Sequence, residues 1–207
     1  MFPVRLSEIP AVQAAADIVG ARHGRRGRNR LGEIVQVRHL DRGDVEVMAR
    51  LFDGLSAQGR YLRFLSAVPR FSARTLERLA DADGINHVAL VAFRAEQPIG
   101  EARFVRSATE PDAADLALAV VDDEQHRGVG RMLVVALAEE AERLGVRRFT
   151  FDVSPENRRV LSLLDRSGAR RRLADQVVSG ELLVRTLLTA DSAAATLASD
   201  TSTRAAA

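Results

Sequence analysis

VVDDEQHRGVGR (120–131) is the stretch that decides the fold of this 207-residue chain. An apolar, strand-like run comes immediately before it, and apolar residues recur at helical spacing from Arg131 to Leu144 after it. Gly145 then supplies a stop signal for that helix. We therefore expect a strand that turns through Gly128 and Gly130 and passes directly into a helix.

Such a junction of strand, loop and helix suits a bound phosphate. The first N–H groups of a helix have no partner within the helix, and the helix dipole adds partial positive charge there. Glycines let the backbone approach an anion closely and adopt positive φ. With Arg127 and Arg131 as charges at the rim, the stretch predicts a cradle for a diphosphate.

The motif differs from two other nucleotide-binding loops. All 30 basic residues of the chain are arginines, so the lysine of a P-loop is missing. The glycine spacing also differs from the G-x-G-x-x-G of dinucleotide-binding folds. A short G-x-G alone is equally compatible with a simple tight turn, so its position among the other elements matters.

Turn and periodicity signals give the order of the elements around this loop. A strand is expected at 33–40, followed by helices capped by Asp41, Ser56 and Ser72. The later expected elements are strands at 87–94, 99–106, 114–121 and 147–153, a helix opened by Pro155 and ended by Gly168, and a hairpin of 170–178 and 181–187 around Ser179-Gly180. This order predicts an α/β domain with one mixed sheet.

Composition divides the chain into three parts. Residues 1–32 are expected to be a flexible basic segment with a short helix at 7–19. Residues 33–188 are expected to form the folded domain. Residues 189–207, rich in Ala, Ser and Thr, are expected to be a disordered tail.

The charge pattern argues against nucleic acid as a partner. The net charge is only +2, and the pI of 10.1 reflects the lack of Lys and Cys, which leaves almost nothing to titrate between histidine and arginine. DNA binding needs a concentrated cationic surface.

The four histidines show no metal-ligand spacing. No apolar run reaches the roughly 18 residues of a membrane helix, and no signal peptide is visible, so we expect a cytoplasmic protein without metal.

Two spaced motifs resemble the GNAT superfamily of acetyl-CoA-dependent transferases. Gln125-His126-Arg127-Gly128-Val129-Gly130 is similar to the family's [QR]-x-x-G-x-[GA] stretch. Asn157 would open a helix that closes at Ser167-Gly168-Ala169, and this stretch is similar to the family's N-x10-G-[FA] element. The resemblance covers 34–187 and implies a mixed, mostly antiparallel central sheet, flanked by helices and splayed at its fourth and fifth strands. It also implies acetyl-CoA as the acyl donor.

A narrower resemblance points to the bacterial protein lysine acetyltransferases of the Pat type. Arg60-Tyr61-Leu62-Arg63-Phe64 and Pro69-Arg70, with Ser56 before them, look like that subgroup's S-x-x-x-R-Y-x-R-F…P-R segment. The stretch 87–92 resembles the strand that follows it. The resemblance implies an amine acceptor, either a protein lysine or a small molecule. The subgroup's domain is often fused to a regulatory or ligase-like domain, so a differently directed enzyme remains open.

The resemblance also implies the site residues. An amine must lose its proton before it attacks a thioester, and lysine is mostly protonated at neutral pH. The implied base is Asp115, where Pat-type enzymes carry Glu, with Glu101 in reserve. Leu164 stands where many members have a Tyr that protonates the leaving thiolate. The implied donor-binding residues are the strand backbone at Ala119, Val120 and Val121, the loop residues Gln125, His126, Arg127, Gly128, Val129, Gly130 and Arg131, and Asn157.

Two alternatives from other classes stay open. Asp in place of Glu at position 115 would also suit a catalytically weak acyl-CoA-binding sensor or scaffold. The arginine-rich stretch 21–30 would suit a nucleic-acid-binding arm, although a flexible basic segment is the simpler interpretation. The sequence is compatible with a monomer or a homodimer.

Overall fold

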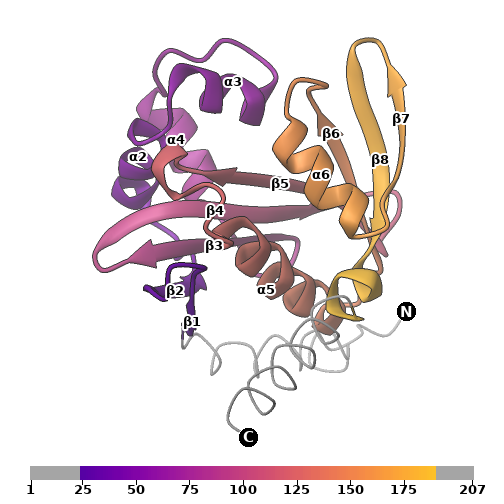
Figure 1. The fold of residues 1–207 in the computed structure, drawn as a ribbon, viewed down its shortest axis with the longest axis horizontal. Coiled ribbons are helices and arrows are strands. Elements are labelled where there is room, and N and C mark those ends of the chain that lie inside the picture. The colour runs from indigo at the N-terminus through magenta and orange to yellow at the C-terminus, as the bar shows by residue number, and fades with distance from the viewer. Residues whose placement is uncertain (1–23, 190–207) are drawn as a thin grey trace, which may run out of the picture.

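An eight-stranded sheet forms the centre of the computed structural model, which describes residues 24–189 (Figure 1). Its spatial order is β1-β2-β3-β4-β5-β6-β8-β7, so β8 lies between β6 and β7. The strands are β1 (Arg25–Arg28), β2 (Ile34–His39), β3 (His87–Arg94), β4 (Gln97–Arg106), β5 (Ala113–Val120), β6 (Arg148–Val153), β7 (Arg170–Ala174) and β8 (Val177–Leu183).

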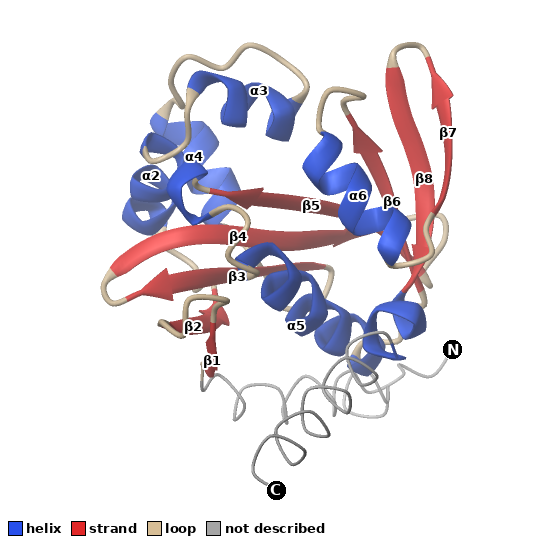
Figure 2. Ribbon diagram, in the orientation of Figure 1, coloured by secondary structure: helices blue, strands red, loops and turns tan. Residues whose placement is uncertain are grey.

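Helices cover both faces of this sheet (Figure 2). On one face, α5 and α6 bury apolar side chains in a core that contains Phe104 and Phe149. On the other face, α2 and α4 pack over a smaller core around Phe52. Among the described residues, no helix combines the length and the apolar character needed to cross a bilayer. The helices are α2 (Val45–Asp53), α3 (Ala57–Phe64), α4 (Ala73–Ala80), α5 (Val129–Arg143) and α6 (Arg158–Arg166), with the 3-10 helix η3 (Asp122–Glu124) and a last helix at 184–189.

One pair of strands is parallel and separates along its length. β5 pairs with β6 only as far as Asp115, which lies opposite Thr150, whereas the other neighbouring strands are antiparallel. Beyond Asp115 the two strands diverge (Figure 1). The expected fold, a mostly antiparallel sheet splayed at its fourth and fifth predicted strands, is confirmed, because those strands are β5 and β6.

The sheet starts earlier in the chain than expected. Arg25–Arg28 form β1, which pairs with β2 so that Arg25 lies opposite Val37. The prediction of a flexible segment is therefore wrong for these residues. Their sequence, RRGR, has no apolar alternation that would reveal a strand, because an edge strand can join a sheet through its backbone alone. The expected helix at 7–19 and the tail beyond 189 lie outside the described residues.

Several helix ends follow the predicted signals. Ser56 and Ser72 accept hydrogen bonds from backbone N–H groups in the first turns of α3 and α4, which confirms both as N-caps. Gly145 and Gly168, after α5 and α6, have φ of +78° and +75°. Only glycine reaches such values without strain, so these two residues end their helices as expected.

Two helices start later than expected. α2 begins at Val45, after Asp44 rather than after Asp41. The carboxylate of Asp44 accepts the N–H of Asp41 and pairs with Arg38 at 2.7 Å, which holds the intervening residues in a turn. α6 begins after Asn157, as the family element implied, and not at Pro155, because the side chain of Asn157 accepts the N–H of Val160 at 3.2 Å and caps the helix there.

The final hairpin turns at a different place from the one predicted. Asp175 and Gln176 form the turn, with φ of +49° and +64°, and Ser179-Gly180 lies inside β8. A Cβ on Gly180 would lie 2.3 Å from the carbonyl oxygen of Arg170. The glycine is therefore required by the close approach of β7 to β8 rather than by a turn.

Candidate active site

The divergence of β5 and β6 leaves two adjoining cavities. The larger, about 650 Å³, lies over residues 125–131, here called the phosphate loop. The smaller, about 250 Å³, is lined by Asp115 and by side chains of β6 and α6. α3 and α6 face each other across this gap (Figure 1). The residues that line both cavities are Leu62, Arg63, Leu118, Asn157, Val160 and Leu163.

The phosphate loop has the backbone that its glycines allow. Gly128 precedes α5 with φ +90°, and His126 is also in the left-handed region at +63°. No side chain caps α5, and Met132 N–H bonds to the carbonyl of Gly128 at 3.1 Å. The earlier amides of this helix have no partner within it, and Gly128 and Gly130 both line the larger cavity. This geometry suits a bound anion.

Gln125 fixes the start of the phosphate loop. Its Nε2 donates to the carbonyl of Val120 at 3.0 Å, and Arg159 of α6 donates to its Oε1. These two bonds tie the loop to β5 and to α6. They also hold the guanidinium of Arg159 at the edge of the larger cavity, which it lines.

Guanidinium groups dominate the charge around the larger cavity. They come from four parts of the chain: the β1–β2 connection, α3, α5 and the α6 helix. Glu124 is the one carboxylate residue among the lining residues. A polyanion such as a nucleotide with several phosphates therefore suits this cavity better than a cationic ligand. The arginines are Arg30, Arg63, Arg131, Arg158, Arg159 and Arg166.

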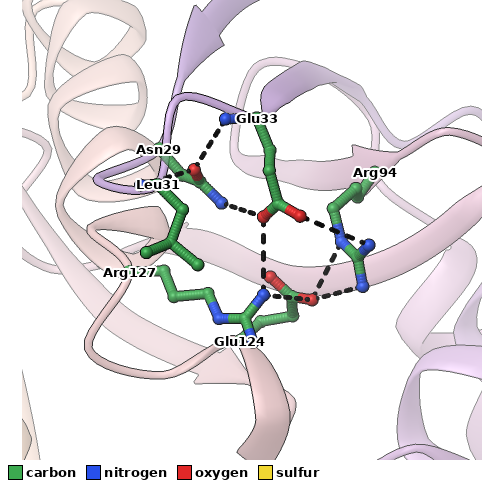
Figure 3. A network of polar contacts seen from close by, with 6 residues as sticks. All are labelled: Asn29, Leu31, Glu33, Arg94, Glu124 and Arg127. Carbon is green, nitrogen blue, oxygen red and sulfur yellow. Dashed lines mark hydrogen bonds and ion pairs between the residues drawn. The ribbon is translucent and has the colours of Figure 1, made fainter.

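Arg127 does not point to the cavity as the sequence suggested. Its guanidinium lies 3.4 Å from Glu33 and 3.5 Å from Glu124, in a network that also includes Arg94 and Asn29 (Figure 3). Arg127 is not among the residues that line the larger cavity. The predicted rim charge is therefore part of a network behind the loop.

The backbone of β5 offers donors at alternate residues. Val121 N–H donates to Ile99 of β4 at 3.0 Å, so it does not face the gap as the resemblance implied. In an antiparallel ladder the next residue points the other way, and Val120 and Leu118 therefore direct their N–H groups toward the gap. Ala119 faces β4 with its backbone, although the residue lines the larger cavity.

Asp115 lies where the two strands begin to separate. It lines the smaller cavity together with Asp152 of β6. Burial, with a smaller contribution from Asp152, raises the pKa of Asp115 above its usual value, and Arg63 opposes the change. A carboxylate with a raised pKa in a mostly apolar cavity suits a general base.

Glu101, the reserve base, is committed elsewhere. Its side chain has no exposed surface and pairs with Arg63 at 3.2 Å and with Arg103. Burial alone would raise the pKa of Glu101, but Arg103 and Arg63 outweigh it and hold the pKa below its usual value. A carboxylate held between two cations resists protonation, so Asp115 is the better candidate.

Asn157 and Leu164 occupy α6 at the cavities. Asn157 lines both cavities, but its Oδ1 already caps the helix, which leaves its amide nitrogen for a ligand. Leu164 is 3% exposed and lines the smaller cavity, where it has no proton to give. Among the described residues, no cluster of His, Cys, Asp and Glu could hold a metal ion.

Several charged residues at the cavities were not predicted as site residues, among them Arg63, Asp152 and Arg30. Arg63 belongs to the segment that resembles Pat-type enzymes, which gives it no role of its own, and Asp152 lies in an ordinary strand pattern. Arg30 belongs to the segment expected to be flexible. All three reach the site through contacts between distant parts of the chain, for which a single sequence carries no signal.

Comparison with known proteins identifies the family. The model of the acetyltransferase (GNAT) family matches residues 57–169. Acetyltransferase Pat of Mycolicibacterium smegmatis (strain ATCC 700084 / mc(2)155) is 35% identical over 145 residues, which are 68% of this chain and 42% of that protein. The chain belongs to the GNAT family of acetyltransferases. It spans less than half the length of this relative.

Solved structures agree with this assignment. The GNAT domain of S. lividans PAT has a TM-score of 0.73 and 28% identity, covering 77% of this chain and 96% of that domain. The cAMP-binding acyltransferase from Mycobacterium smegmatis has a TM-score of 0.58 and 25% identity, covering 88% of this chain and 62% of that one. The resemblance to Pat-type proteins is thereby confirmed at the level of homology.

Proposed function

We propose that this chain transfers an acetyl group from acetyl-CoA to a primary amine, by direct attack of the amine on the thioester. The observation that carries the proposal is the meeting of the two cavities. One is lined by helix-start amides and arginines, and the other by a carboxylate with a raised pKa. Arg63, Leu118 and Asn157 line both.

The larger cavity suits the donor. Its arginines and the start of α5 would hold the phosphates of acetyl-CoA. The outward N–H groups of Leu118 and Val120 would bind the thioester carbonyl and the pantetheine arm, because a splayed strand keeps its donors unpaired. Acetyl-CoA supplies the acyl group and a thiolate leaving group.

The smaller cavity suits the acceptor. Asp115 would take a proton from the ammonium, directly or through water, and the neutral amine would attack the thioester carbon. A C–N bond then forms, the C–S bond breaks, and the thiolate leaves. Leu164 offers no acid, and a thiol pKa near 8.5 makes the thiolate a fair leaving group without one.

Among the amine acceptors we favour a lysine side chain of another protein. The walls of the smaller cavity are mostly aliphatic, and the one cation among its lining residues, Arg63, is paired with Glu101, which leaves the carboxylates of Asp115 and Asp152 to match a flexible alkyl chain that ends in a cation. The homology to Pat-type proteins supports the same choice. A small primary amine is the alternative acceptor.

The test is an acetyl-transfer assay with radiolabelled acetyl-CoA, a panel of lysine-containing proteins and peptides, and small amines. The chain has no lysine, so label on the enzyme's own side-chain amines cannot be mistaken for transfer. We expect turnover with wild type, and none with Gly128→Glu, which places a like charge in the phosphate cradle.

Other outcomes would overturn the proposal. If wild type binds acetyl-CoA by calorimetry but acetylates nothing in the panel, the chain is an acyl-CoA-binding sensor or scaffold. If wild type binds no acyl-CoA at all, the phosphate loop is not a binding site for the diphosphate of coenzyme A.

A further inference from the structure

We propose that Arg30 is a phosphate-binding residue of the donor site, held over the phosphate loop by the connection between β1 and β2. Residues 29–33, here called the clasp, lie outside the segment that the family model matches, 57–169. The inference rests on the proposed function, because the ligand is the phosphate-bearing half of acetyl-CoA.

The clasp is a tightly bonded turn. Asn29 is 6% exposed, and its Oδ1 accepts the N–H groups of Leu31 and Glu33, each at 3.0 Å (Figure 3). Its Nδ2 donates to the carboxylate of Glu33 at 2.7 Å. Gly32 adopts φ +80° and donates to the carbonyl of Asn29. A turn with this many internal bonds holds its backbone in one conformation, and so fixes the direction in which the side chain of Arg30 leaves the chain.

The clasp is bonded directly to the phosphate loop. The backbone N–H of Arg30 donates to the carbonyl of Arg127 at 2.8 Å, and its guanidinium lies 3.4 Å from the carbonyl of His126. A Cβ on Gly128 would lie 3.5 Å from Cγ of Arg30, so the side chain packs against the glycine of the cradle. Arg30 lines the larger cavity as a result.

Charge balance distinguishes Arg30 from Arg127. The network behind the loop contains two carboxylates, Glu33 and Glu124, and two guanidiniums, Arg94 and Arg127 (Figure 3). Arg127 is therefore neutralised by its neighbours. Within residues 24–189 no carboxylate pairs with Arg30, so its charge is available to a ligand. The clasp thus adds a cation to the larger cavity beside Arg131, whereas Arg127 does not line that cavity.

Arg30→Gln tests the proposal, with Arg26→Gln as the matched control. Both remove one charge from an exposed arginine of the same region, and Arg26 does not line the cavity. Arg30→Gln keeps the backbone bond to Arg127, so it removes only the side-chain contact. Binding by calorimetry and steady-state kinetics are measured with acetyl-CoA and with acetyl-pantetheine, which lacks the nucleotide and its phosphates.

We expect Arg30→Gln to weaken acetyl-CoA binding about tenfold, the size typical of one charge-assisted bond. KM for acetyl-CoA should rise while kcat stays constant, acetyl-pantetheine should be unaffected, and Arg30→Lys should recover part of the loss. Equal binding by wild type and Arg30→Gln, or an equal loss with acetyl-pantetheine or with Arg26→Gln, would overturn the proposal. If wild type itself binds no acetyl-CoA, the proposed function fails instead.

Discussion

The guanidinium of Arg63 lies 3.2 Å from Oε1 of Glu101, a carboxylate with no exposed surface. Arg103 binds the other carboxylate oxygen, with its Nε 2.8 Å from Oε2. Arg63 also lines both cavities, so this buried carboxylate positions a cation where the two cavities meet. Burying a charge is costly unless it is paired. The stability of the fold should therefore be sensitive to the loss of any one of Glu101, Arg63 and Arg103.

Glu101→Gln is expected to destabilise the fold by about 3–5 kcal/mol, because it leaves the two arginines without their buried partner. Chemical denaturation measures the change. Glu142→Gln, at an exposed glutamate of α5, is the control and should stay within about 0.5 kcal/mol of wild type. A small change for Glu101→Gln would show that water or rearrangement compensates for the lost charge.

The same carboxylate predicts a dependence of stability on pH. The pKa of Glu101 is held below its usual value in the folded state, so its contribution is fully present above the pH at which an unfolded glutamate titrates, about 4.3. That contribution is lost as the pH falls through the folded-state pKa. When the pH is lowered from about 5 to about 2, the free energy of unfolding should therefore fall more for wild type than for Glu101→Gln.

The raised pKa of Asp115, to which Asp152 contributes, should set the pH dependence of activity. Asp115→Asn should lower kcat by about 10²-fold or more, because it removes the proposed base, and Asp115→Glu should retain activity. Since burial and Asp152 raise the pKa of Asp115, activity should decline on the acid side at a higher pH than an ordinary aspartate would give. Asp152→Asn should shift this decline to lower pH, as measured by kcat/KM profiles. An unshifted profile would rule out Asp115 as the titrating base.

Gly180→Ala is expected to destabilise the β7–β8 hairpin. The new Cβ would lie 2.3 Å from the carbonyl of Arg170 and 2.6 Å from the ring of Phe151, and the backbone atom cannot move aside as a flexible side chain would. Such overpacking costs about 1–3 kcal/mol. Gly59→Ala in α3 is the matched control, because its nearest contacts would be ordinary, at 3.4 Å or more. Thermal melting should show a lower Tm for Gly180→Ala and a higher Tm for Gly59→Ala, since alanine favours a helix more than glycine does.

The elements that the sequence revealed are those with local signals. Gly128 follows an apolar strand and precedes a periodic helix, and the structure places it at the start of α5. Ser56 and Ser72 cap helices through bonds to residues three positions later. Each of these features depends on the neighbouring sequence alone, so a single chain is enough to find them.

The remaining features depend on contacts between distant residues. β1 joins the sheet by backbone bonds to β2, which impose no pattern on its side chains. Arg127 turns away from the cavity because Glu33, 94 residues earlier, lies behind the loop. Asp152 reaches Asp115 only because β5 and β6 are parallel neighbours. Sequence spacing cannot show any of these three relationships.

Asp122 links α3 to the phosphate loop, both of which line the larger cavity, here called the cleft. Its Oδ2 accepts the N–H of Ser56, the N-cap of α3, at 2.9 Å, and its Oδ1 lies 3.5 Å from Nε2 of Gln125. One carboxylate therefore joins the helix on one side of the cleft to the start of the phosphate loop. Asp122→Ala removes this link and should cost about 0.5–1.5 kcal/mol, the usual net value for a hydrogen bond, because the carboxylate is exposed to water.

The loss of the link should also raise KM for acetyl-CoA, because Leu55, Gly59 and Leu62 from this side of the cleft line the larger cavity. The control is Asp123→Ala at the exposed neighbouring position, which should change neither stability nor KM. Asp122→Asn should recover part of the effect, since its amide oxygen still accepts the bond from Ser56. If Asp122→Ala loses stability but keeps its KM, the link supports the fold without setting the shape of the donor site.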